Sequence, residues 1–353
     1  MENKYISKRA QKIVPYTYGE QPKDKKYIKL NTNENPYPPS PRAVEVIRNI
    51  PADIYKLYSD PSCKELKEAI GDFYNIDANK IFVGNGSDEV LAFSYLAFLD
   101  KGDKVIYPDI TYSFYTVYSS LYEVEELINP LNDDFSMNLQ GFNQDAKVCI
   151  ITNPNAPTGI ALSLEEIEGI IEKNKDKLLI VDEAYIDFGG ESAVKLIDKY
   201  DNLLVVQTYS KSRSFASLRI GFAMGNPILI EALHKIKDSI NPYTLDTIGI
   251  KAGAEAMRHK EYFYECCNKI IATRERVKKE LAKLGFQGTD SKSNFLFVNH
   301  NKVEAKEIFE KLRVEGILVR YFNKAKINNY LRISIGTDEE MDIVIEKLRG
   351  IVL

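Results

Sequence analysis

One lysine of the sequence lies where an amine could do covalent chemistry. Lys211 follows the apolar run 203–207 and the hydroxyl side chains of Thr208 and Ser210, and Arg219 comes eight residues later. Most lysines are solvated surface residues, but a lysine at a strand edge beside anion-binding groups is a candidate Schiff-base amine. The hydroxyl groups and the guanidinium are candidates for binding an anion beside it.

Two adjacent carboxylates end a second apolar run. Asp182 and Glu183 follow residues 178–181, and Tyr185 comes two positions later. Carboxylates at a strand end could hold a metal ion, serve as acid and base, or bind a cationic ring nitrogen. A nucleotide hydrolase also has carboxylates there, but it requires the pattern GxxxxGK[ST], which this chain lacks.

Two glycine- and proline-containing turns follow other apolar runs. Residues 83–89 read VGNGSDE, so glycines lead into a helix whose free N–H groups and dipole favour an anion such as phosphate. Residues 153–159 read NPNAPTG, where two prolines and a glycine fix a rigid loop and the asparagines offer neutral donors. Each segment by itself is also compatible with a plain structural turn.

Alternating strands and helices must position these segments. The sequence predicts strands at residues 81–83, 104–107, 148–152, 178–181, 203–208 and 220–224, and helices at residues 62–73, 88–99, 163–173 and 228–239. Several strands are continuously apolar, as is typical of strands buried on both faces of a mostly parallel sheet. In such an α/β sheet, ligands bind at the carboxyl edge, where the polar segments described above are expected.

The last hundred residues have a different pattern. A long charged helix at 262–284 precedes strands at 295–299, 317–320 and 330–334, with helices at 303–315 and 339–348. This order is typical of a smaller α+β unit. The first thirty residues contain Pro15, Gly19 and Pro22 and are expected to form an extended arm. We therefore predict an arm (1–30) that joins a small C-terminal domain (246–353), and a large domain (31–245).

Composition excludes several classes of protein. The formal charge is -4, with 47 Lys plus Arg against 51 Asp plus Glu, which argues against a nucleic-acid binder. The three histidines lie far apart without other ligands at metal-binding spacing, so no metal site is expected. The N-terminus has no apolar secretory segment, and the apolar stretch 90–99 is too short to span a membrane. Four cysteines without a disulfide pattern favour a reduced, cytoplasmic protein.

The order and spacing of these segments resemble the fold-type I pyridoxal-phosphate aminotransferases and, within their class II subgroup, the histidinol-phosphate aminotransferase family. The resemblance runs from VPY (14–16) through LNTNENP (30–36), DEAY (182–185) and the Ser-Lys pair to LRISIG (331–336). It implies a large domain with a mostly parallel sheet between helices, a smaller α+β domain and the cofactor pyridoxal 5′-phosphate. It also implies amino transfer between L-histidinol phosphate and 2-oxoglutarate in histidine biosynthesis.

The same resemblance implies roles around the cofactor. Lys211 would form the Schiff base and then move a proton, and Asp182 would pair with the pyridinium nitrogen so that the ring can accept electrons. Tyr185 would bond the 3′-oxygen, and Tyr112 would stack on the ring. The phosphate would bind the backbone N–H groups of Gly86, Ser87 and Asp88, the hydroxyl groups of Thr208 and Ser210, and the guanidinium of Arg219.

For the remaining sites the resemblance implies a homodimer and a substrate-binding set. Tyr58 matches a tyrosine that reaches the phosphate of the neighbouring subunit's cofactor. The substrate would bind Tyr16, Asn35, Arg320 and Arg332, because a guanidinium accepts phosphate or carboxylate oxygens. The family has an asparagine at the position of Ala156, so either Asn155 replaces its contact with the 3′-oxygen or Tyr185 makes that contact alone.

Three alternatives stay open on the sequence. A threonine-phosphate decarboxylase shares this fold and many of the motifs. A broader aromatic or acidic amino-acid transaminase would share the cofactor site. A protein of a different class, a regulator that keeps the cofactor only as a sensor, would retain the fold without turnover.

Overall fold

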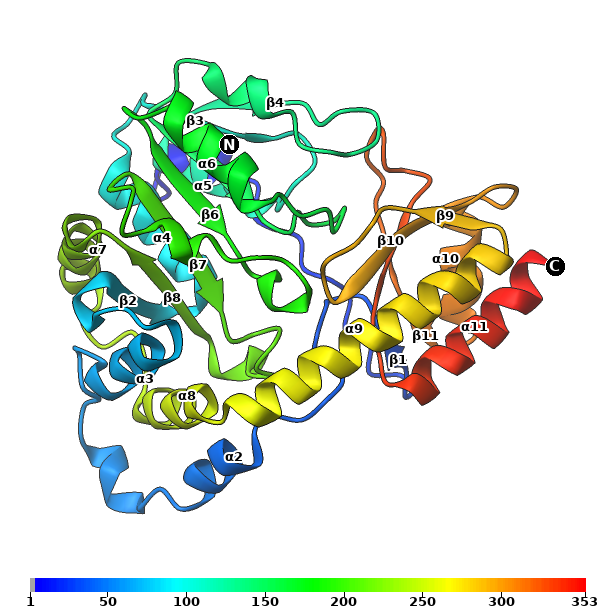
Figure 1. The fold of residues 1–353 in the computed structure, drawn as a ribbon, viewed down its shortest axis with the longest axis horizontal. Coiled ribbons are helices and arrows are strands. Elements are labelled where there is room, and N and C mark those ends of the chain that lie inside the picture. Colours follow the sequence, from blue (N-terminus) through cyan, green and yellow to red (C-terminus); the bar gives the residue numbers. More distant parts are fainter. Residues whose placement is uncertain (1–3) are drawn as a thin grey trace.

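Seven strands form the central sheet of the protein (Figure 1). The computed structural model describes residues 4–353. Their order across the sheet is β2 (Ile81–Asn85), β8 (Ile220–Gly225), β7 (Leu203–Thr208), β6 (Leu178–Asp182), β5 (Val148–Thr152), β3 (Lys104–Pro108) and β4 (Glu125–Asn129). The neighbouring pairs are parallel except for the two that β8 makes with β2 and β7. The predicted α/β fold with a mostly parallel sheet is confirmed.

Helices cover both faces of this sheet, because successive side chains of each buried strand point to opposite faces. One face packs against α3 (Lys64–Tyr74), α6 (Leu164–Lys173) and α8 (Thr247–Arg258). The other packs against α4 (Gly86–Phe98), α5 (Phe114–Tyr122) and α7 (Pro227–Ile240). With both faces covered, ligands can reach the sheet only at its edges and strand ends.

The predicted strands and helices of this part are confirmed, but one strand of the sheet and two of the helices that cover it were not predicted. β4 is a charged, partly exposed edge strand, so it lacks the apolar run that marked the other strands. α5 is rich in aromatic residues, which favour strands by propensity. α8 contains Gly249 and Gly253, residues that disfavour a helix in isolation, and most of it is buried by packing.

A second sheet lies in the C-terminal part, with the order β12 (Arg320–Tyr321), β13 (Leu331–Ser334), β10 (Phe295–His300) and β9 (Phe286–Gly288). It is accompanied by α9 (Lys260–Lys283), α10 (Ala305–Val314) and α11 (Asp338–Val352) (Figure 1). The predicted strand at 317–320 was wrong as a single element. β11 (Ile317–Leu318) pairs in parallel with β1 (Ile28–Lys29) of the arm, whereas β12 pairs with β13.

The N-terminal segment is mostly extended, with one short helix, α1 (Lys8–Lys12), which Ser7 caps. Its pairing through β1 brings the segment beside the C-terminal part of the chain.

The domain boundaries at residues 30/31 and 245/246 stay a prediction. The remaining elements are α2 (Pro41–Arg48) and the 3₁₀ helices η1 (Ala52–Lys56), η2 (Ala78–Lys80), η3 (Leu139–Asn143), η4 (Ile186–Phe188), η5 (Ala193–Leu196) and η6 (Ala216–Leu218). Along residues 4–353, every helix is too short or too polar to cross a membrane.

Candidate active site

A cavity of about 260 Å³ lies at the carboxyl edge of the seven-stranded sheet and extends to the arm and to β12 and β13. Most of the predicted site residues line it: Tyr16, Ser87, Asp88, Tyr112, Asp182, Tyr185, Thr208, Ser210, Lys211, Arg219, Arg320 and Arg332. They come together because β2, β6 and β7 run in the same direction and therefore end at one edge. β8 runs in the opposite direction, so its first residue follows Arg219 at that edge.

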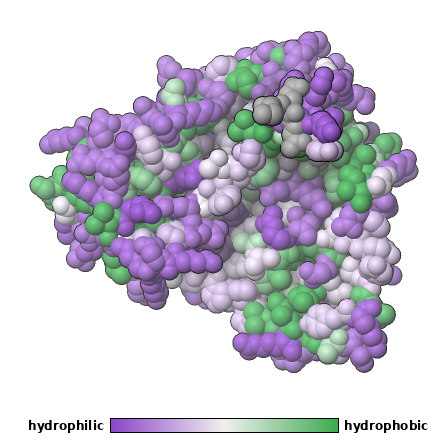
Figure 2. Space-filling model, turned by 180° about the vertical axis from the view of Figure 1, so that it is seen from behind, coloured by the Kyte–Doolittle hydropathy of each residue, from purple (hydrophilic) through white to green (hydrophobic). Residues whose placement is uncertain are grey.

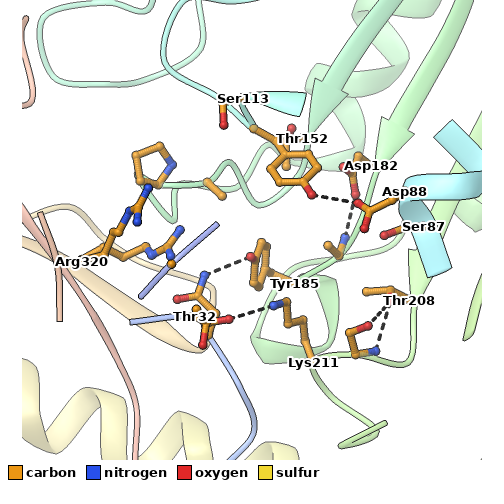
Figure 3. Close-up of a pocket in the computed structure, with 18 of the residues that line it drawn as sticks. Thr32, Ser87, Asp88, Ser113, Thr152, Asp182, Tyr185, Thr208, Lys211 and Arg320 are labelled. Carbon is orange, nitrogen blue, oxygen red and sulfur yellow. Dashed lines mark hydrogen bonds between the residues drawn. The ribbon is translucent and has the colours of Figure 1, made fainter. Parts of the chain in front are cut away.

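Lys211 projects into the cavity from the loop after β7 (Figure 3). Its Nζ donates a hydrogen bond to the backbone oxygen of Thr32 at 3.1 Å and lies 5.8 Å from the ring centre of Tyr185. Asn35 does not line the cavity. Its amide instead donates to the backbone oxygens of Lys211 and Ser212, at 3.0 and 3.2 Å, and so holds the lysine loop in place.

Asp182 and Glu183 have separate surroundings although they are adjacent. Asp182 lines the cavity and accepts hydrogen bonds from the backbone N–H of Ala184 at 3.2 Å and from a tyrosine hydroxyl behind it. Burial raises the pKa of Asp182 to about 6 and that of Glu183 to about 7. Glu183 lies outside the cavity and is fully engaged with Ser192, Ala193 and Gln207.

A set of donors lies where α4 begins. The first N–H groups of a helix have no acceptor within the helix, so they are free to bind an anion. Arg219 reaches this point and pairs with Asp88 through Nη2 at 2.9 Å, and the hydroxyl of Tyr112 donates to Asp88 at 2.8 Å. Gly86 has φ +82°, and a Cβ on it would lie 2.5 Å from Nη2 of Arg219, so a glycine is required there.

Hydroxyl groups complete this end of the cavity. Thr208 and Ser210 both line it, and their Oγ atoms lie 3.0 Å apart. The backbone N–H of Ser210 donates to Thr208 Oγ1 at 3.1 Å, which fixes the turn that leads to Lys211. Hydroxyl donors, free backbone N–H groups and a guanidinium together form a site suited to a phosphate group.

Two arginines line the opposite side of the cavity. Arg320 and Arg332 are paired residues of β12 and β13, so their side chains project from neighbouring strands. Figure 3 shows Arg320 across the cavity from Asp88. Arg332 donates through Nη2 to the backbone oxygen of Asn31 at 3.1 Å, while its buried Nε has no hydrogen-bond partner among the described residues. Burial lowers the pKa of Arg332, and the nearby Arg320 lowers it further. Tyr16 reaches this side from the arm and stacks on Phe114 at 4.5 Å.

Asn155 and Tyr58, like Asn35 and Gly86, are predicted residues that do not line the cavity. Asn155 is buried beneath it, and its amide donates to the backbone oxygen of Ile110 at 2.9 Å and to Thr158 Oγ1 at 3.1 Å, while Ala156 lines the wall. Tyr58 is 83% exposed and stacks on Tyr243 at 4.6 Å. Among residues 4–353, no hydrogen bond or ion pair joins Asn155 or Tyr58 to another predicted site residue.

Several cavity residues were not predicted: Thr32, Asn33, Glu34, Thr111, Thr152 and Phe322. Asn33 donates to the hydroxyl of Tyr185 at 3.0 Å. Thr152 ends a predicted strand at the carboxyl edge, which was a usable signal. Phe322 carried no such signal, because only the meeting of the two sheets brings it there. The described residues contain no group of three or more His, Cys, Asp or Glu that could hold a metal ion.

Comparisons with known proteins agree with this geometry. The sequence profile of the family "Aminotransferase class I and II" matches residues 25–348. A histidinol-phosphate aminotransferase of Brachyspira hyodysenteriae is 54% identical over 99% of both chains, and one of Clostridium acetobutylicum is 54% identical over 98% of this chain and 99% of its own. The structure of the Sinorhizobium meliloti histidinol-phosphate aminotransferase in complex with pyridoxal-5′-phosphate is similar in fold, with a TM-score of 0.85, 24% identity and coverage of 93% and 91%.

Proposed function

The chain belongs to the class I and II aminotransferases, and on this basis we propose that it transfers an amino group between L-histidinol phosphate and 2-oxoglutarate. The products would be imidazole acetol phosphate and L-glutamate, as in histidine biosynthesis. The observation that carries the proposal is one cavity that contains an amine, Lys211, together with anion-binding groups on two opposite sides. A cofactor phosphate and a substrate phosphate each require such a set of groups.

The residues of the cavity fit pyridoxal 5′-phosphate. Arg219 and the start of α4 would bind its phosphate, where Gly86 leaves room for the guanidinium. Asp182 would face its ring nitrogen, since that buried carboxylate lines the cavity. When bound, this cofactor acts as an electron sink for the carbon that bears the amino group.

The chain's own groups would then bind the substrate and move the proton. Arg320 and Arg332 would take the phosphate of histidinol phosphate in one half-reaction and a carboxylate of glutamate in the other, because a guanidinium fork fits both anions. Lys211 Nζ would accept the proton from the amino-bearing carbon of the substrate and would then donate it to C4′ of the cofactor. Tyr185 would bind the cofactor's 3′-oxygen, and Asn33 would hold the Tyr185 hydroxyl in place.

We also propose that the active enzyme is a homodimer. Tyr58 and its neighbours Tyr55 and Leu57 are exposed in the single chain, at 83%, 60% and 65%. In a dimer, Tyr58 would reach the partner's cofactor phosphate, as the family resemblance implies. A cytoplasmic location is the matching proposal, supported by four free, buried cysteines that suit a reducing compartment.

The decarboxylase alternative is not favoured, because the relatives with 54% identity over nearly the whole chain carry the name of the transaminase.

A coupled assay with 2-oxoglutarate should compare histidinol phosphate, phenylalanine and threonine phosphate as substrates. We expect kcat/KM for histidinol phosphate to exceed that for phenylalanine by about a hundredfold or more, since phenylalanine lacks a phosphate for the paired arginines. Near-equal rates would contradict the narrow substrate assignment and leave the transaminase assignment intact. Carbon dioxide release from threonine phosphate without a keto acid would favour the decarboxylase.

A further inference from the structure

Behind Asp182 lies a tyrosine that does not reach the cavity. Tyr115 belongs to α5, and its side chain is completely buried between that helix and the sheet. Its hydroxyl donates to Oδ2 of Asp182 at 2.8 Å and lies 2.8 Å from Oγ1 of Thr152. Thr152 Oγ1 in turn lies 3.0 Å from Oγ1 of Thr111. Three hydroxyl groups therefore form a continuous chain that ends on the carboxylate.

The number of available protons sets the direction of this chain. An ionised carboxylate only accepts hydrogen bonds, and each hydroxyl has a single proton to donate. When the proton of Tyr115 is donated to Asp182, Thr152 has to donate to Tyr115, and Thr111 has to donate to Thr152. All three O–H dipoles then point toward Asp182, and each bond strengthens the next.

This arrangement counteracts the cost of burying the Asp182 carboxylate. Burial raises the pKa of Asp182 to about 6, while the hydrogen bonds from Tyr115 and from the N–H of Ala184 lower it. The nearby Asp88 adds a repulsion that raises it. Tyr115 keeps its own proton, because burial raises the pKa of its hydroxyl well above the ordinary value. Tyr115 thus remains a donor throughout the pH range in which Asp182 ionises.

We propose that Tyr115 is a positioning residue, which acts through Asp182 to keep its carboxylate ionised and directed at the ring nitrogen of the cofactor. One oxygen of Asp182 is oriented by Ala184 and the other by Tyr115, so the plane of the carboxylate is fixed from two sides. The inference rests on the proposed use of pyridoxal 5′-phosphate, but it is independent of which amino donor the enzyme takes.

The test is a cofactor titration of the full-length protein, with dissociation constants measured by absorbance. Tyr115→Phe removes only the hydroxyl group. Tyr107→Phe is the matched control, because Tyr107 is also buried and its hydroxyl donates to Glu126 rather than to Asp182. We expect Tyr115→Phe to weaken cofactor binding about tenfold, the effect of losing a hydrogen bond to a charged group. The control should remain within about twofold of the wild type.

A second titration separates positioning from a general structural role. It uses the carbocyclic analogue of the cofactor, in which a C–H group replaces the ring nitrogen. If Tyr115 acts through Asp182 on that nitrogen, the penalty of Tyr115→Phe should fall to less than about twofold with the analogue. Equal penalties with both compounds, or no penalty with either, would overturn the proposal.

Two further variants keep the test decisive if Tyr115→Phe does not fold. Thr152→Val should weaken binding of the normal cofactor but not of the analogue. Thr152→Ser should bind the normal cofactor as the wild type does, because only the hydroxyl of this residue is needed for the chain of hydrogen bonds. Unchanged binding in Thr152→Val would count against the proposal. Failure of the wild type to bind the cofactor would overturn it together with the proposed function. If the wild type binds the cofactor but does not convert histidinol phosphate, only the substrate assignment is contradicted. Cofactor binding by Tyr115→Phe and the wild type then still decides the inference.

Discussion

Asp182 and Glu183 illustrate how surroundings, rather than residue type, separate the roles of two neighbouring carboxylates. Only Asp182 lines the cavity, whereas Glu183 is surrounded by protein donors. Lys211 is distinguished in the same way. Its Nζ lies among cavity residues and is held near Tyr185 by the backbone oxygen of Thr32.

The assignment of Lys211 is tested by chemical trapping. Borohydride reduction of the protein with bound pyridoxal phosphate should attach the cofactor covalently to the peptide that contains Lys211, as found by mass spectrometry. Lys211→Ala should lose this product and at least about a thousandfold of activity, because the amine would be both the attachment point and the proton carrier. Lys292→Ala, a lysine outside the cavity, should behave like the wild type. Full activity in Lys211→Ala would refute the assignment.

The pH dependence of stability tests the burial of Asp182. Its carboxyl pKa is about 6 in the folded protein against an ordinary value of 3.8, so the folded state binds this proton more tightly. The resulting stabilisation is complete below about pH 4 and is lost as the pH rises through 6. We therefore expect the free energy of unfolding of the cofactor-free wild type, measured in urea, to fall by roughly 1 kcal/mol relative to that of Asp182→Asn between pH 5 and 7.

A surface carboxylate provides the control for this measurement. The side chain of Asp145 is 99% exposed. The difference in free energy of unfolding between Asp145→Asn and the wild type should therefore stay constant over the same pH range. If the wild type instead gains stability relative to Asp182→Asn as the pH rises from 5 to 7, the direction assigned to Asp182 is wrong.

At the scale of elements, the reversed direction of β8 builds the anion-binding end of the cavity. β8 lies between β2 and β7, and its residue Gly221 pairs with both Gly84 and Thr208. The start of α4 passes directly over it: a Cβ on Gly221 would lie 2.2 Å from the carbonyl carbon of Gly86. The helix start and Arg219 can meet only because this strand has no side chain at that point.

Gly221→Ala should therefore disrupt the anion-binding end. A contact of 2.2 Å cannot be accommodated without moving α4 away from β8, so we expect a loss of about 2 kcal/mol or more in the free energy of unfolding. Pyridoxal phosphate affinity should fall by at least about tenfold in the same variant. Gly169→Ala is the control, because Gly169 lies in α6 with open space around it and should be neutral or slightly stabilising. Wild-type affinity in Gly221→Ala would contradict the importance of this close approach.

At the scale of the whole molecule, the single chain leaves apolar groups uncovered beside α2. Tyr55, Leu57, Tyr58 and Tyr243 are exposed there, and one of the groups of hydrophobic residues in Figure 2 lies at the lower right, where α2 lies in that view. Monomeric proteins rarely expose contiguous apolar patches of this kind. The proposed dimer would cover it.

Leu57→Asp should therefore weaken the dimer. We expect the wild type to have the mass of a dimer in light scattering, and the variant to dissociate at micromolar concentration because a buried, unpaired charge is costly. Its activity should fall with the dimer population, since Tyr58 would no longer reach the partner's site. Val314→Asp introduces the same charge at a residue that is 77% exposed on α10 and should stay dimeric. A monomeric, fully active wild type would refute the shared site.

The sequence by itself determined the α/β alternation, the order of the motifs and many of the residues that line the cavity. Strand positions and burial follow from apolar runs, and polar groups at strand ends share one edge of a parallel sheet. It did not reveal α8, whose glycines are stabilised only by packing, or the division of residues 317–321 between two sheets.

The tertiary structure decided what depends on contacts between distant segments. It brought Arg320 and Arg332 to the cavity from a second sheet, with Phe322 just after β12, and it placed Asn35 behind Lys211 rather than in the cavity wall. It also placed the hydroxyl of Tyr115 against Asp182, residues that are 67 positions apart. No local pattern encodes such a contact, because a buried hydrogen bond requires both the direction of the side chain and the exclusion of water, and packing sets both.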